Sequence, residues 1–268
     1  AHRSFALGPE GKLVAVADEA GVVRLIDVAT GKGQSPLRAT GHHHRVSALA
    51  FYPDGGRFLS GDYRGNVIAW DFGRGREHFK LETTTYLSVM IIHPNAKTAI
   101  GAVQDGIALW DLDTRRIVKR MGEGVYQRIA LSPDGKRLAA VHRDEHLTVW
   151  DLSKDQPLYQ LKGDLGRSDG LAFSPEGDLL ATAGTDGAVR LWDAATGKPL
   201  RTFREEPKDK FFRRRYVHVG FTGKDRLVAL DDNGGIEVRD ATTGAVLMRA
   251  RYGRDRAHCA LHPSGGRG

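Results

Sequence analysis

The chain repeats itself about every 40 residues, and this repetition limits its possible folds more than any other feature. A closing dipeptide, most often Trp-Asp, recurs at Ile26-Asp27, Trp70-Asp71, Trp110-Asp111, Trp150-Asp151, Trp192-Asp193 and Arg239-Asp240. Successive closing aspartates are separated by 44, 40, 40, 42 and 47 residues. Self-similarity at such a period indicates an array of one supersecondary unit whose neighbours bury a shared core.

The segment from Leu171 to Asp193 shows the repeat most clearly. It contains three apolar runs, separated by Ser174-Pro175-Glu176-Gly177 and by Gly184-Thr185-Asp186-Gly187. Proline presets φ for the second position of a turn, and glycine accepts the positive φ that ends it, so both segments predict tight reversals. After Asp193, Gly197 ends another turn and a fourth strand begins near Pro199. Each repeat therefore predicts a four-stranded antiparallel meander.

The closing Trp-Asp, the first-turn proline and the Gly41-His42 pair together give a resemblance to the WD40 repeat family. The likeness covers nearly the whole chain. In that family each repeat of about 40 to 45 residues forms one four-stranded blade of a β-propeller. The resemblance implies an all-β chain with blades at about residues 1–40, 41–83, 84–122, 123–163, 164–204 and 211–252.

The last residues predict the start of a seventh blade, a fragment spanning 254–268. Ala257 to Leu261 would form its first strand, and the turn around Pro263 would follow. We expect residues 1–268 to be a single β-propeller domain and a truncated seven-bladed ring, because the chain begins and ends within that blade. The alternative is a closed six-bladed ring in which the tail from Arg254 packs across the seam.

The family resemblance also implies a buried hydrogen-bonded relay of His, Ser or Thr, Asp and Trp in well-matched blades. By alignment to the residue before the second-turn glycine, no repeat has all four. The matching residues are His42, Ser60 and Trp70 in the second repeat, Thr182, Asp186 and Trp192 in the fifth, and Asp144 and Trp150 in the fourth. Arg64 stands at the Asp position of the second repeat, and Asp164 at the His position of the fifth. We therefore expect apolar packing between blades to supply most of the stability.

Composition excludes several classes of protein. The only cysteine, Cys259, rules out an internal disulfide framework and a cysteine-rich zinc site, and it favours a reducing compartment. No apolar run approaches the roughly 18 residues that a membrane span needs, and no signal-peptide pattern opens the chain. We expect a soluble cytoplasmic protein without membrane contact. The formal net charge of +7 modestly favours acidic partners.

The sequence gives little support to catalysis. His42-His43-His44 has the composition of a metal tract, but consecutive residues of an extended segment point in alternating directions, and His42 already fits the repeat. The acidic pairs Asp144-Glu145 and Asp231-Asp232 lie in second turns, where acids are ordinary turn formers. No nucleophile elbow, phosphate-binding loop or His-x-x-x-His helix is present. We predict a non-enzyme with no catalytic residue, metal or cofactor.

Arginine and aromatic residues recur in the connections that the resemblance places on one face, where partners of the family commonly dock. The candidate partner-binding residues are Arg45, Tyr63, Arg64, Tyr86, Arg143, Arg167, Phe211, Phe212, Arg213, Arg214 and Arg215. Interface anchors are enriched in Arg and aromatic residues. For any one arginine the alternative is a solvated loop, and Glu205, Glu206 and Asp209 neutralise part of the charge of the last cluster.

The leading hypothesis is a noncatalytic scaffold that binds acidic or phosphorylated segments of other proteins on this Arg and aromatic face. Its warrant is largely the family resemblance. One alternative is nucleic-acid binding through the same face, which would weaken steeply with salt. Another is the sensory or scaffold module of a larger enzyme, such as a kinase, whose catalytic domain lies outside these residues.

Overall fold

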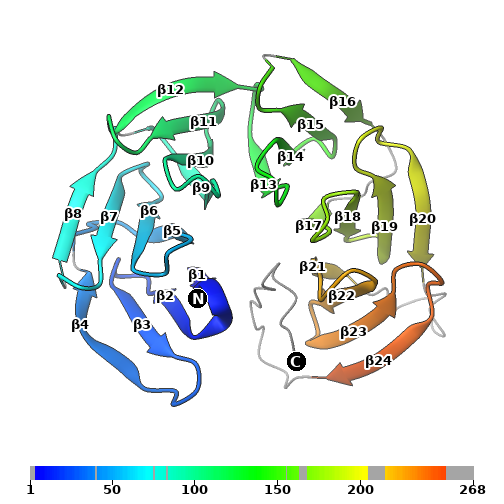
Figure 1. Ribbon diagram of the computed structural model, residues 1–268, viewed down its shortest axis with the longest axis horizontal. Coiled ribbons are helices and arrows are strands. Elements are labelled where there is room, and N and C mark those ends of the chain that lie inside the picture. The colour runs from blue at the N-terminus through cyan, green and yellow to red at the C-terminus, as the bar shows by residue number, and fades with distance from the viewer. Residues whose placement is uncertain are drawn as a thin grey trace. The chain divides into compact units, whose positions relative to one another are not determined.

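The structure is a computed structural model that describes residues 4–39, 41–74, 76–82, 84–154, 156–162, 168–204 and 215–251. For residue 10 and residues 34–39 it describes the backbone alone. These ranges form six four-stranded antiparallel sheets, and within each sheet the strands pair in chain order (Figure 1). The predicted all-β fold with six four-stranded blades is confirmed. The seventh blade, with Cys259, lies outside the described residues.

The chain divides into two compact units, residues 1–129 and 130–268, which we describe separately. The first unit holds the first three blades. Their strands are β1 (Ser4–Leu7), β2 (Leu13–Ala17), β3 (Val23–Asp27) and β4 (Gly33–Ala39); β5 (Val46–Phe51), β6 (Arg57–Asp62), β7 (Val67–Asp71) and β8 (Arg76–Lys80); and β9 (Leu87–Ile92), β10 (Thr98–Val103), β11 (Gly106–Asp111) and β12 (Arg116–Met121). A short 3-10 helix, η1 (Pro9–Gly11), forms the first turn of the first blade.

The second unit holds the last three blades, and the boundary between the units falls inside β13. The strands of these blades are β13 (Tyr126–Leu131), β14 (Arg137–His142), β15 (Leu147–Asp151) and β16 (Pro157–Leu161); β17 (Ser168–Phe173), β18 (Leu179–Gly184), β19 (Ala188–Asp193) and β20 (Pro199–Arg204); and β21 (Tyr216–Phe221), β22 (Arg226–Asp231), β23 (Gly235–Asp240) and β24 (Val246–Arg251). The two turns predicted in the fifth blade separate β17 from β18 and β18 from β19, and β20 begins at Pro199.

The closing aspartate organises the turn between the third and fourth strands of a blade. In the fifth blade, Asp193 Oδ1 accepts hydrogen bonds from the backbone N–H of Thr196 at 2.8 Å and from its hydroxyl at 2.7 Å. Gly197 then takes a φ of +71°, a left-handed conformation that favours glycine. The same arrangement recurs where Asp27, Asp111 and Asp240 each precede a threonine by three residues.

In the second to fifth blades, the second and third strands are buried on both faces. In the fourth blade Leu138, Ala139 and Ala140 are fully buried, although consecutive side chains of a strand point to opposite faces. In the first unit, Leu59 of β6, Leu87 of β9 and Trp110 of β11 belong to one core between the second and third blades. Burying a large apolar side chain stabilises by about 1.5–3 kcal/mol. This packing explains why the runs show little apolar–polar alternation.

The sixth blade replaces the closing tryptophan with a buried ion pair. Arg239 lies in the tryptophan position, and its Nε donates to the fully buried carboxylate of Glu237. Arg249 Nε lies 3.2 Å from the other oxygen of Glu237, and Arg239 Nη1 donates to the carbonyl of Gly244 at 3.1 Å. The guanidinium of Arg239 also covers the ring of Phe203. The arginine is therefore fully integrated in the packing of its blade.

We expect alanine at Gly197 to destabilise the protein more than alanine at Gly31. Both glycines follow a threonine in the closing turn, with φ of +71° and +65°. Each substitution costs about 1–2 kcal/mol in backbone strain. Only at Gly197 would the new Cβ also collide, at 2.6 Å from the ring of Tyr159, and overpacking adds about 1–3 kcal/mol. Urea unfolding of the two variants measures the difference, and equal losses would contradict this account of the turn.

We also expect stability to fall in acid as the closing-turn carboxylates become protonated. Hydrogen bonds from the hydroxyl and amide of Ser153, and from Lys154, lower the pKa of Asp151 to about 2. Turn hydrogen bonds also lower the pKa of Asp111 and Asp193. A carboxyl group with a depressed folded pKa stabilises the fold above its unfolded pKa of about 3.9 and loses that contribution as the pH falls. Thermal melting between about pH 4 and about pH 2 should show this decline, and Asp151→Asn should make it shallower.

Candidate partner-binding site

Three connections of the first unit meet at one end of the second blade. The backbone N–H of Tyr63 donates to the carbonyl of Arg45 at 2.9 Å, and that of Thr84 donates to the carbonyl of Gly65 at 3.3 Å. The rings of Tyr63 and Tyr86 pack edge to face with centroids 5.3 Å apart. We call residues 63–66 the docking turn. We call residues 43–45, the docking turn and residues 84–86 together the second-blade rim.

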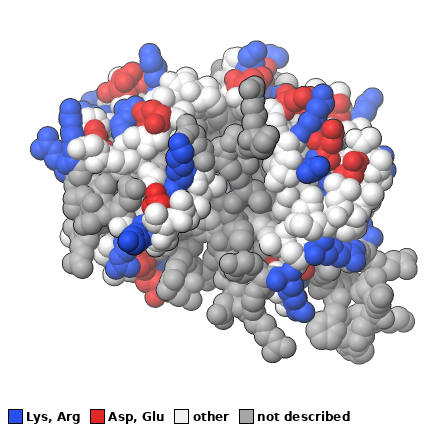
Figure 2. Space-filling view, turned by 60° about the horizontal axis from the view of Figure 1, so that its bottom comes forward, with Lys and Arg blue, Asp and Glu red and all other residues white. Residues whose placement is uncertain are grey.

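The second-blade rim presents exposed cations beside an exposed aromatic ring. Tyr63 is 48% exposed, Tyr86 is half-buried, and Arg45 and Arg64 are exposed. Among the described residues, neither guanidinium takes part in an ion pair, whereas Arg57 lies 2.7 Å from Asp54. On the face shown in Figure 2, by contrast, Lys and Arg stand next to Asp and Glu. No carboxylate among the described residues therefore neutralises the charge of either arginine of the rim.

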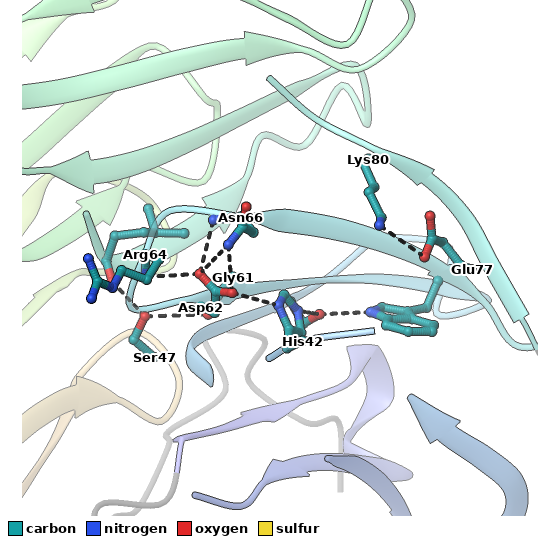
Figure 3. A network of polar contacts seen from close by, with 11 residues as sticks. His42, Ser47, Gly61, Asp62, Arg64, Asn66, Glu77 and Lys80 are labelled. Atoms are coloured by element: carbon teal, nitrogen blue, oxygen red, sulfur yellow. Dashed lines mark hydrogen bonds and ion pairs between the residues drawn. The ribbon is translucent and has the colours of Figure 1, made fainter. Parts of the chain in front are cut away.

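A buried relay lies directly beneath the rim, drawn in Figure 3. The indole N–H of Trp70 donates to Ser60 Oγ at 2.7 Å, and Ser60 Oγ lies 2.6 Å from His42 Nε2. His42 Nδ1 lies 3.2 Å from Asp62 Oδ2. All four residues are at most 5% exposed. The second blade thus holds a complete relay, and the prediction that no repeat has all four members was wrong.

Asp62 connects this relay to the docking turn. Its Oδ2 faces His42, while its Oδ1 accepts the backbone N–H of Arg64 at 2.9 Å and that of Asn66 at 3.0 Å. The side-chain amide of Asn66 donates to both oxygens. Figure 3 shows the guanidinium of Arg64 directed away from His42, on the other side of the turn. One buried carboxylate therefore satisfies the amides that shape the turn carrying Tyr63 and Arg64.

The hydrogen-bond donors give the relay one direction. Trp70 Nε1–H is only a donor, so Ser60 Oγ accepts from it; the carboxylate of Asp62 is only an acceptor, so the Nδ1 of His42 that faces it carries a hydrogen. In the neutral ring, Nε2 is then the acceptor and receives the hydroxyl hydrogen of Ser60. Burial lowers the pKa of His42, and the hydrogen bond to Asp62 opposes this effect only in part. The neutral form suits both the hydrogen bonding and the dry surroundings.

The sequence analysis assigned the acid of the relay to the wrong position. Asp186 pairs instead with Arg190 at 2.5 Å and Arg204 at 2.7 Å, and the side chain of Asp144 is 80% exposed. A residue just before the turn glycine lies at the tip, whereas a residue three positions before it ends the strand and points inside. The overlooked signal is Asp-x-x-Gly, which recurs at residues 18–21, 62–65 and 231–234. The first aspartate of each accepts turn amides in the same way.

The other predicted site residues belong to the second unit or lie outside the described residues. Arg143 is exposed in the β14–β15 turn, and Arg215 Nε lies 3.9 Å from Asp232 Oδ2. Arg167, Phe211, Phe212, Arg213 and Arg214 lie outside the described ranges. The structure thus brings together Arg45, Tyr63, Arg64 and Tyr86. That all these residues share one face remains a prediction.

The described part of the chain gives little support to a metal site, a small-ligand site or a membrane span. Within it, no group of three His, Cys, Asp or Glu side chains could hold a metal ion, and His43 and His44 are exposed beside the buried His42. A pocket between the first turns of the first two blades, lined by Pro9, Phe51 and Pro53, has a volume of about 200 Å³. Sites for small ligands usually measure about 300–1,000 Å³. The described residues include no helix of the length and hydrophobicity that a bilayer span requires.

We expect Ser60→Ala to cost more stability than Thr182→Val. Removing the Ser60 hydroxyl leaves two buried partners, Trp70 Nε1–H and His42 Nε2, without a hydrogen bond, which amounts to roughly 2–4 kcal/mol. Thr182 Oγ1 accepts from the half-buried Trp192 at 3.0 Å, so its loss should cost roughly 1 kcal/mol. Denaturant midpoints at constant m-value compare the two. Equal costs would mean that the relay contributes no more than one isolated hydrogen bond.

Comparisons with known proteins agree with this architecture. The family model described as "WD domain, G-beta repeat" matches residues 34–71 and 156–193. The chain is 31% identical over 122 residues to small ribosomal subunit protein RACK1y of Oryza sativa subsp. japonica, covering 42% of this chain and 36% of that relative. It is 28% identical over 125 residues to small ribosomal subunit protein RACK1 of Schizosaccharomyces pombe, covering 42% of this chain and 40% of the relative.

A third relative is the LST8 homolog of Drosophila melanogaster, 27% identical over 147 residues that cover 52% of this chain and 47% of the relative. The chain thus spans less than half the length of the curated relatives that it matches. Both family-model matches run from a fourth strand to the next closing Trp-Asp, which is the period found in the sequence. With its six four-stranded blades, and with two segments that match the family model, the chain contains WD40 repeats.

Proposed function

We propose that this protein is a noncatalytic scaffold that binds acidic or phosphorylated segments of other proteins through its Arg and aromatic surface. The observation that carries the proposal is the second-blade rim. There, Arg45 and Arg64 lack ion-pair partners among the described residues and flank the exposed ring of Tyr63. Guanidinium groups form strong, often bidentate, hydrogen bonds with carboxylates and phosphates. An exposed aromatic ring adds apolar contact area with little loss of side-chain entropy.

The relatives support an assembly role. Those named RACK1 carry the designation of small ribosomal subunit proteins, so they belong to a large complex. By analogy, this chain would also act by holding other macromolecules. The partner chemistry comes from the rim, since the shared fold does not define a ligand.

Nucleic-acid binding is the second candidate function, favoured by the formal net charge of +7. A duplex or single strand would need several basic side chains along its phosphates, and its affinity would fall steeply with salt. On the face that Figure 2 shows, Lys and Arg are interspersed with Asp and Glu, and this pattern suits a local anion contact better than an extended basic track. A role as the scaffold module of a larger enzyme is compatible with either candidate, and the full-length reading frame decides it.

We expect Arg45→Glu combined with Arg64→Glu to abolish binding to acidic or phosphorylated peptides. The probe is an array of peptides in phosphorylated, glutamate-substituted and neutral forms, from which the tightest binder is titrated. Reversing two charges at the contact should weaken binding at least about 100-fold, since each lost charged hydrogen bond is worth about 1.5–3 kcal/mol. Melting temperature should change little, because exposed charges contribute little to stability.

The matched control combines Arg76→Glu with Arg116→Glu, which reverses the same number of charges at exposed arginines of β8 and β12 with no ion pair among the described residues. It should leave the affinity within about twofold, apart from the change in net charge. Equal weakening of peptide binding by both variants would mean that overall charge, and not contact at the rim, accounts for the loss of affinity. If no peptide binds, while a single-stranded oligonucleotide binds with a steep salt dependence, the second candidate replaces the first.

A further inference from the structure

We propose that the buried relay of the second blade positions the docking turn and makes partner binding at the second-blade rim sensitive to acid. The claim about binding rests on the proposed function, whereas the claim about the turn does not. Asp62 is the positioning residue. It touches no partner, and it acts through the amides of Arg64 and Asn66.

The geometry ties four buried groups to one surface loop. From Trp70, hydrogen bonds run through Ser60 and His42 to one oxygen of Asp62, and the other oxygen accepts the amides of the docking turn. Asp62 is 1% exposed, so water does not replace a partner that it loses. Any change on the His42 side of the carboxylate therefore reaches the turn that carries Tyr63 and Arg64.

Protonation of His42 is the change that the relay accommodates poorly. Protonated His42 would present an N–H from Nε2 to Ser60 Oγ, which already accepts the indole N–H of Trp70. The hydroxyl hydrogen of Ser60 would then lose its acceptor in a site closed to water. An unsatisfied buried polar group destabilises its surroundings, so the protonated relay must rearrange or open.

The charged groups around His42 act in both directions. Asp62 of β6 favours the protonated ring, and Lys80 of β8 disfavours it. Glu77 of β8 lies beside the neighbouring Gly41 and within 3.9 Å of Lys80 Nζ. From the first blade, the β2–β3 turn with Asp18 and Glu19 packs its Gly21 against the backbone of His42. Desolvation outweighs these charges and lowers the pKa of His42.

The direction of the pH effect follows from the linkage between protonation of His42 and stability. A histidine whose folded pKa is lowered contributes its full stability above the unfolded value of about 6.5, and that contribution is lost as the pH falls below it. The docking turn should therefore loosen between about pH 7 and about pH 5. The closing-turn aspartates Asp111, Asp151 and Asp193 have lowered pKa values, so their turns should remain closed in this window.

The test is hydrogen exchange of the whole chain at a series of pH values, read as protection factors that are corrected for intrinsic exchange. From about pH 7.5 to about pH 5, the amides of Arg64 and Asn66 should lose about tenfold or more in protection. The matched control is the fifth-blade turn, where Gly184 takes the place of Asp62 and no histidine is involved. Its Gly187 and Ala188 amides should change less than about twofold.

Two variants sharpen the result. His42→Gln removes the titrating ring, so protection of the docking turn should become independent of pH in this window. Combined His43→Gln and His44→Gln should keep the wild-type profile, because these exposed rings lie outside the relay. If His42→Gln does not fold, the wild-type exchange profile still decides. Equal profiles for the second-blade and fifth-blade turns, or constant protection of Arg64 and Asn66, would overturn the proposal.

The binding arm uses the tightest glutamate-substituted peptide from the array, because a phosphate group itself titrates at about pH 6. Because only the closed turn binds, the affinity of this peptide should follow the closed fraction that exchange gives at each pH, in the wild type and in the combined His43 and His44 variant, and stay constant in His42→Gln. An affinity that departs from this closed fraction would overturn the claim about binding. Absence of any peptide binding would overturn the proposed function, and the exchange profile of the free protein would still test the positioning role of Asp62.

Discussion

Burial of both faces of the central strands is the constraint on which the rest of this structure depends. A single blade cannot bury its own strands, so its second and third strands need a neighbour on each side. This requirement selects small or branched apolar residues at consecutive positions, as in Leu138–Val141. It also leaves the connections between strands to carry polar function, because only they reach solvent at the ends of the blades.

Within that arrangement, the second blade uses one residue for two purposes. Asp62 ends β6, accepts the hydrogen bond of the buried relay, and satisfies the amides of a surface turn. The first blade places Asp18 similarly, with turn amides on its carboxylate and Arg24 at 3.6 Å. The fifth blade has Gly184 at this position, and its Asp186 is held by two arginines instead. Blades of one fold can therefore hold equivalent turns by different electrostatic means.

The blades were largely predictable from sequence, because turn chemistry and apolar runs are local signals. The turn at Ser174–Gly177 separates β17 from β18, and the fourth strand of that blade begins at Pro199, as the sequence predicted. The relay was only partly predictable. His42, Ser60 and Trp70 were recognised, but the acid was assigned by its distance from the turn glycine along the chain, whereas it depends on which residue ends the strand. The contacts of Tyr63 with Arg45 and Tyr86 could not be predicted, because the three residues come from three connections that meet only in the folded chain. A repeat in the sequence does not show which connections meet.

The central claim is that partners dock on the second-blade rim. Chemical-shift mapping of the full chain with the tightest phosphorylated or acidic peptide tests it most directly. The account predicts that the largest perturbations fall on the amides of residues 63–66 and on the ring of Tyr86, with a smaller response at the first turns around Pro9 and Pro53. Those turns precede β2 and β6, whereas the docking turn follows β6. Perturbations concentrated there, with the docking turn unaffected, would contradict the account.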